Sequence, residues 1–119
     1  MQFIVKLVAP DGQEFYLEWS SIVDGPVTVG MSREHFERYY RKQYGELAMD
    51  RLPKRLTRAE KYGTSSMEQT TAEEMLTGNR AGPDEANLTM SEIIDAYCLR
   101  KPIRDGWKPF RWIPFRQDA

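Results

Sequence analysis

Cysteine and histidine are almost absent from this sequence of 119 residues, which contains one of each, Cys98 and His35. A single cysteine excludes an intrachain disulfide framework, and one cysteine with one histidine provides too few soft ligands for a structural zinc site. We interpret Cys98 as a small buried hydrophobic residue and His35 as a surface or capping residue of a helix, rather than as a catalytic pair. We therefore expect no metal site.

Motifs for catalysis and for cofactors are missing as well. Neither G-x-x-x-x-G-K-[ST] nor G-x-G-x-x-G occurs, so the sequence has no recognisable loop for the phosphates of a nucleotide cofactor. Ser65 and Ser66 lack the strand–turn–helix setting of a serine hydrolase nucleophile and are interpreted as a turn after a helix. We expect no catalytic residues, no cofactor and no enzyme activity.

Long hydrophobic runs are also lacking. No stretch approaches the 18 apolar residues of a membrane-spanning helix. The residues after Met1 lack the basic region and apolar run of a signal peptide, because Lys6 interrupts them early. We therefore expect a cytoplasmic protein with no membrane partner.

Neither sign of charge dominates, since 17 Lys and Arg residues oppose 18 Asp and Glu residues for a net charge of −1. The charges are nevertheless grouped along the chain. Residues 1–29 carry −3, residues 30–62 carry +4, residues 63–100 carry −5 and residues 101–119 carry +3. Either these blocks pair with one another across the fold, or one of the basic blocks faces a partner.

The N-terminal part alternates in the manner of two β-strands. Residues 2–9 and 14–20 place apolar side chains at every second position, and the turn formers of residues 10–13 separate them. This pattern predicts a half-buried antiparallel hairpin whose apolar face must be covered by helices or by a third strand. Residues 23–26 break the pattern and are expected to begin a loop.

Capping residues mark four helical segments after the hairpin. Ser32 is expected to cap a helix over residues 33–44, and Pro53 to open a second helix that ends before Gly63. Two capping boxes predict a short helix ending at Gly78 and a helix through about Arg100, formed by Thr71 with Glu74 and by Thr89 with Glu92. The fold class is therefore α+β: a hairpin packed with three to four short helices in one domain over residues 1–102.

The C-terminal segment contains a repeated pattern, W-x-P-F, at residues 107–110 and 112–115. Its two prolines exclude a regular helix and a central strand, so we expect residues 103–119 to form an extended tail. The tail either buries its rings on the domain or serves as a recognition segment, and both can hold together. Aromatic and arginine side chains are typical of interface hot spots, so the candidate protein-binding residues are Trp107, Phe110, Arg111, Trp112, Phe115 and Arg116.

The second predicted helix carries a broad basic face. Its cations recur at helical spacing and could contact phosphates of a nucleic acid: Arg51, Lys54, Arg55, Arg58 and Lys61. The seven residues between Gly45 and Pro53 are too many for the short turn of a helix-turn-helix motif. Nucleic-acid binding by residues 51–61 is therefore the alternative to protein binding, and neighbouring acids could equally neutralise this face.

Three groups of residues form distinctive strings: residues 16–28 with Gly30-Met31-Ser32, residues 55–58 with 63–66, and residues 79–83. In combination these strings resemble small uncharacterised proteins encoded by phages of actinobacteria. The resemblance covers about residues 14–98 and implies a phage-encoded protein in a host bacterial cytoplasm, with no activity attached. It favours an accessory role or a minor virion component over a housekeeping enzyme.

We therefore expect a small accessory protein that binds another protein, a host factor, without catalysis. The aromatic tail or an exposed strand edge would provide the binding surface. Nucleic-acid binding and a place in the virion are the alternatives.

Overall fold

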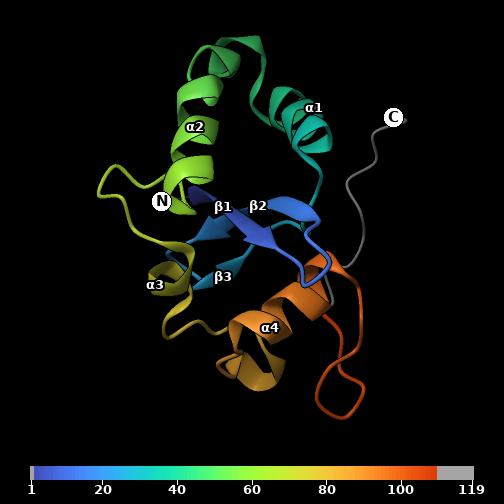
Figure 1. The fold of residues 1–119 in the computed structure, drawn as a ribbon. Helices are drawn as coiled ribbons and strands as arrows, with labels where there is room; N and C mark the ends of the chain where they lie inside the picture. Colours follow the sequence, from blue (N-terminus) through green and yellow to red (C-terminus); the bar gives the residue numbers. More distant parts are fainter. Residues whose placement is uncertain (1, 110–119) are drawn as a thin grey trace.

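A computed structural model describes residues 2–109 and shows a three-stranded antiparallel sheet between two layers of helices (Figure 1). The strands are β1 (Gln2–Val8), β2 (Glu14–Ser20) and β3 (Gly25–Pro26), in the order β1-β2-β3. Val5 lies opposite Leu17, and Trp19 lies opposite Pro26. The predicted α+β class and the hairpin are confirmed.

One face of the sheet is covered by α1 (Arg33–Tyr44), a 3-10 helix η1 (Glu46–Asp50) and α2 (Leu52–Tyr62). As predicted, the Ser32 side chain caps α1 by accepting a hydrogen bond from the backbone N–H of His35. Gly45 ends α1 with φ near +90°, a conformation that glycine adopts without strain. The core on this face joins α1 and α2 to both long strands through Ile4, Tyr16, Met31, Phe36, Tyr39, Tyr40, Leu52, Leu56 and Ala59.

The opposite face is covered by α3 (Ala72–Leu76), α4 (Met90–Ile93) and the π-helical turn η3 (Ile94–Cys98), with a short 3-10 turn η2 (Pro83–Glu85) between them. Both predicted capping boxes are present at the starts of α3 and α4. The second core packs these elements against the other sheet face, through residues that include Val5, Leu7, Phe15, Leu17, Trp19, Leu76, Ile93, Ile94, Tyr97 and Cys98.

The expectation of a half-buried hairpin is wrong, because helices cover both sheet faces. Residues 15–20 of β2 are all buried. Tyr16 and Glu18, which alternation placed on the polar side, point at the α1 and α2 layer and find hydrogen-bond partners there. The polar atoms of these two side chains therefore form buried hydrogen bonds with protein groups and do not face solvent.

Two further corrections concern the strands. Residues 25–26, expected in a loop, pair with β2 as β3. The outer edge of β1, expected to be open to a partner, is occupied at residues 4–6 by the segment after α2: Lys6 donates to the Gly63 carbonyl at 2.9 Å, and Ser65 donates to the Ile4 carbonyl at 2.9 Å. Backbone groups of this segment thus satisfy part of the edge that a partner strand would use.

The described helices are short. None of those within residues 2–109 has both the length and the apolar character needed to cross a membrane.

Candidate functional site: a basic hollow beside α2

Four cationic residues at the start and along one side of α2 surround a hollow of about 600 Å³, which we call the basic hollow. It is lined by Gln2, Tyr40, Asp50, Arg51, Lys54, Arg55, Arg58 and Met67. The start of β1, the buried side of α1, the first turns of α2 and the loop after α2 all contribute to it. Four of the five basic residues predicted from spacing therefore meet at one concave site.

Lys61, the fifth predicted residue, does not line the hollow. It lies one turn further along α2, with its ammonium nitrogen 5.3 Å from the centre of the Tyr62 ring. Helical spacing alone grouped Lys61 with the other four cationic residues, but in the structure it lies outside their site.

Arg55 is the most firmly held cation of the hollow. Its guanidinium donates to the Tyr40 hydroxyl at 2.6 Å, to the Gln2 carbonyl at 3.0 Å and to Ser65 Oγ at 3.4 Å. It also lies 5.7 Å from the centre of the Tyr40 ring, within the range of a cation–π contact. Arg55 is half-buried and fixed in place by uncharged groups.

Arg58 is held in a similar way. Its Nε donates to the backbone carbonyl of Ser65 at 2.9 Å, and its side chain is half-buried. The Ser65 segment is itself fixed, because the backbone N–H of Ile4 donates to Ser65 Oγ at 2.8 Å. The loop after α2 therefore both covers the edge of β1 and positions two guanidinium groups.

The positive charge of the hollow is not cancelled by ion pairs. Within residues 2–109, no carboxylate forms a salt bridge with the four cations of the hollow. Asp50 is the carboxylate that lines it. Glu60, also on α2, is bound by Arg33 at 2.7 Å and by the Tyr16 hydroxyl at 2.8 Å, and these hydrogen bonds hold the pKa of Glu60 below its usual range. Half-buried cations with neutral partners retain their attraction for an anion.

A second hollow of about 310 Å³ adjoins the first, since the two share Gln2, Arg55, Arg58 and Met67. Its other lining residues are Phe3, Ser65, Ser66 and Glu68. Phe3 is half-buried, and the Met67 side chain is 79% exposed. We call this the apolar hollow, because it adds apolar surface beside the cations.

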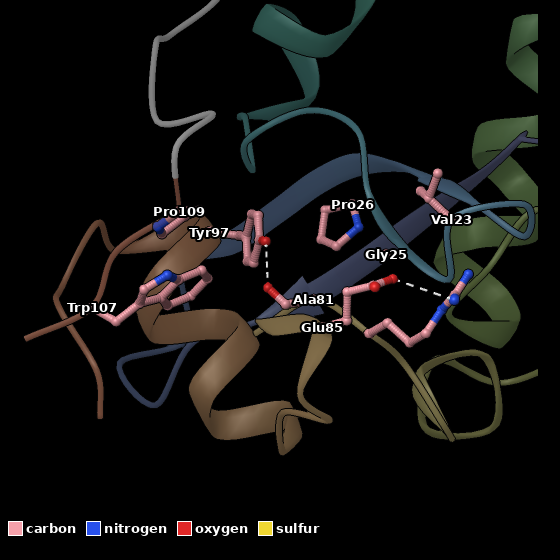
Figure 2. Close-up of a pocket in the computed structure, with 9 residues that line it drawn as sticks. Val23, Gly25, Pro26, Ala81, Glu85, Tyr97, Trp107 and Pro109 are labelled. Atoms are coloured by element: carbon pink, nitrogen blue, oxygen red, sulfur yellow. Dashed lines mark hydrogen bonds and ion pairs between the residues drawn. The ribbon is translucent and has the colours of Figure 1, made fainter. Parts of the chain in front are cut away.

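A third pocket, of about 260 Å³, lies on the other side of the molecule where the C-terminal segment meets the domain (Figure 2). Trp107 and Pro109 form one end of it and Val23 the other (Figure 2). The Tyr97 hydroxyl donates to the Ala81 carbonyl at 2.8 Å, and Arg80 pairs with Glu85 at 3.3 Å. Its charges are thus paired within the pocket.

Trp107 packs against the second core, the one that α3, α4 and η3 form with the sheet, and Pro109 is buried. Before them the chain does not run extended: Ile103 and Trp107 form a bridge across a tight turn, with φ near +55° at Asp105 and +78° at Gly106. The remaining predicted tail residues lie outside the described residues, and their role stays a prediction: Phe110, Arg111, Trp112, Phe115 and Arg116.

Cys98 and His35 lie in different surroundings. Burial raises the pKa of the Cys98 thiol to about 12, whereas His35 is exposed at the start of α1. In the part of the chain that the structure describes, no three His, Cys, Asp or Glu side chains are grouped to hold a metal ion.

No family model, curated protein or solved structure matches this chain. The resemblance to actinobacterial phage proteins therefore stays an expectation from the sequence, and the function is argued from geometry.

Sequence reasoning missed the residues that hold the cations. The Tyr40 ring is buried in the core beside Phe36, and its hydroxyl accepts a hydrogen bond from Arg55. Gln2 and Ser65 contribute through contacts with residues far away along the chain. No local pattern could have assigned these roles, because each depends on how β1 packs against α2.

Proposed function

We propose that the protein is a non-catalytic binding protein that holds the phosphates of a nucleic acid in the basic hollow. The observation that carries the proposal is the set of four cations around one concave site, two of them fixed by neutral acceptors. This raises the nucleic-acid alternative above binding through the tail.

Fixed arginines suit this role for two physical reasons. A guanidinium presents several donors in a plane and binds phosphate oxygens in pairs, so its orientation matters. Side chains ordered before binding lose less conformational entropy when the ligand arrives. Arg55 and Arg58 are already ordered, while the exposed Arg51 and Lys54 extend the charge toward solvent.

A pair of charge reversals on the same helix tests this proposal. Lys54→Glu alters a lining residue, whereas Lys61→Glu makes the same change in charge outside the hollow. Fluorescence anisotropy with a labelled oligonucleotide at low salt should show at least a ten-fold loss of affinity for Lys54→Glu and less than a three-fold loss for Lys61→Glu. Equal losses in both variants, or no binding by the wild-type protein to DNA or RNA, would contradict it.

Protein binding is the second candidate, and the surface around Trp107 favours it. The turn before β3 exposes 75% of Ile22, and its position is fixed by Arg80, which bonds the Asp24 carbonyl at 2.8 Å and pairs with the Asp24 carboxylate at 3.4 Å. An exposed apolar residue on a fixed turn beside the Trp107 pocket is suited to anchor a host protein.

Removal of residues 110–119 tests this second candidate, because Trp107 and Pro109 are retained. If the tail recognises a host protein, the truncated chain should remain folded and fail to retain a partner that the full chain captures from bacterial lysate. Retention of the same partner would assign it to another surface. Detection of the protein in purified phage particles would instead support the virion alternative.

A further inference from the structure

We propose that the two adjoining hollows bind a single-stranded nucleic acid, with a phosphate in the basic hollow and a base in the apolar hollow. The inference rests on the proposed function and specifies its ligand.

The shape of the site favours a single strand. Both hollows are concave, and the Arg55 and Arg58 guanidinium groups shared between them are half-buried. A duplex keeps its bases stacked inside and offers phosphates on a convex surface. Its phosphates could contact the exposed Arg51 and Lys54, but a duplex would fill neither hollow. A single strand can turn an unstacked base into a pocket.

The two hollows differ in charge in the way such a ligand requires. The basic hollow is lined by four cationic residues and one carboxylate, Asp50, whereas the apolar hollow is lined by two cationic residues and one carboxylate, Glu68. A phosphate therefore binds better in the basic hollow. The Glu68 carboxylate, which repels a phosphate, can accept a hydrogen bond from the N–H donor that every base, thymine included, carries on its Watson–Crick edge.

The lining of the apolar hollow suits the face of a base. Phe3 and Met67 provide apolar surface. Within residues 2–109, most of the Met67 surface is exposed to solvent. The Arg55 and Arg58 guanidinium planes lie at the same site, and such planes stack on bases. These contacts do not depend on which base is present, so binding with little sequence preference is expected.

The test compares three labelled ligands of equal length at one salt concentration by fluorescence anisotropy. They are a 12-nucleotide oligothymidine, the same backbone with abasic sites, and a 12-base-pair duplex. Base–side chain stacking contributes about 1–3 kcal/mol per base, which corresponds to a five-fold or larger preference. We expect the oligothymidine to bind at least five-fold more tightly than either of the other ligands.

A matched pair of variants locates the base. Met67→Ala should reduce the preference for intact over abasic strand at least three-fold, and Leu47→Ala, at an 88% exposed position outside both hollows, should leave it unchanged. Both positions are highly exposed, so neither variant is expected to disturb folding.

The outcomes separate this inference from the proposed function. Equal affinity for the intact and abasic strands, tighter binding of the duplex, or an unchanged preference in Met67→Ala overturns the inference while phosphate binding stands. Failure to bind all three ligands overturns the proposed function, and this inference with it.

Discussion

At the scale of single residues, Glu18 shows how the fold accommodates a buried charge. Its side chain on β2 is 1% exposed. The Tyr39 hydroxyl donates to one carboxylate oxygen, and the Tyr44 hydroxyl lies 2.9 Å from both oxygens and 2.7 Å from Gln2 Oε1. A carboxylate surrounded by phenol donors is stabilised without a cation. It connects α1 to β2, and the same Tyr44 hydroxyl reaches Gln2 at the start of β1, beside the basic hollow.

Replacement of this carboxylate should separate its hydrogen bonds from its charge. Glu18→Ala removes the carboxylate that accepts from the Tyr39 hydroxyl and one of the two acceptors of the Tyr44 hydroxyl, and it should lower the free energy of unfolding by about 1–3 kcal/mol. Glu18→Gln keeps an acceptor oxygen and removes the buried charge, so it should retain most of the stability. Urea denaturation measures both, and an alanine variant as stable as the wild type would contradict the role assigned to Glu18.

The same tyrosines predict a loss of stability at high pH. Burial, followed by the hydrogen bond to Glu18, raises the pKa of Tyr44 to about 12 and that of Tyr39 above its usual range. Burial and the bond to Glu60 likewise raise the pKa of Tyr16. Tyrosines of the unfolded chain ionise near pH 10, so the unfolded state loses these phenol protons at a lower pH than the folded state. The contribution of the raised pKa values to stability is therefore complete below pH 10. It is lost as the pH rises toward 12 and beyond.

Unfolding measured in urea between pH 8 and pH 12 tests this expectation. The free energy of unfolding should be constant up to about pH 9 and then fall, and Tyr44→Phe should make the fall shallower. A profile that stays flat to pH 12, or one that Tyr44→Phe leaves unchanged, would argue against the buried phenol network.

At the scale of elements, the segment that follows α2 determines both the sheet edge and the site. Gly63 ends α2 with φ near +101°, and from there the chain bonds along β1 and holds Arg55 and Arg58 through Ser65. A Cβ at Gly63 would lie 2.9 Å from the backbone nitrogen of Ala72, which leaves no room for a side chain. Gly78 also has a positive φ, near +71°, but no atom lies within 4 Å of such a Cβ.

These two glycines give a matched pair of substitutions. Gly78→Ala incurs the conformational cost alone, about 1 kcal/mol, whereas Gly63→Ala should lose about 2–4 kcal/mol because a close contact is added to that cost. Gly63→Ala should also weaken oligonucleotide binding under conditions where it remains folded, since Ser65 is displaced. Thermal unfolding of both variants measures the first effect, and equal losses would contradict the close packing at Gly63.

The helices and strands could be predicted from local sequence signals, whereas the contacts between them could not. Ser32, Pro53, Thr71 and Thr89 mark the helix starts because caps act within one turn of the chain. The π-helical turn at Ile94–Cys98 was missed, because its bond from the Leu99 N–H to the Ile94 carbonyl spans one residue more than an α-helical bond and hardly alters the hydrophobic pattern.

At the scale of the whole molecule, the sheet is shared by two cores, and its burial on both faces explains which parts of the site were predictable. The cations of residues 51–58 could be predicted from spacing, since α2 turns Leu52, Leu56 and Ala59 inward. Their convergence on one hollow depends on β1, α1 and the loop after α2, which meet through contacts more than 50 residues apart in the sequence. A net charge of −1 gives no sign of this local excess of positive charge.

The dependence of affinity on salt tests the central claim most directly, because it measures phosphate contacts. For a single strand, log K falls with log salt concentration by about 0.7 for each phosphate that a cation neutralises. The double variant Arg51→Gln/Lys54→Gln removes two cations and should therefore reduce the slope for a 12-nucleotide oligothymidine by about 1.4, whereas Lys61→Gln should leave it unchanged. Identical slopes for the wild type and the double variant would contradict the account that the basic hollow holds phosphates.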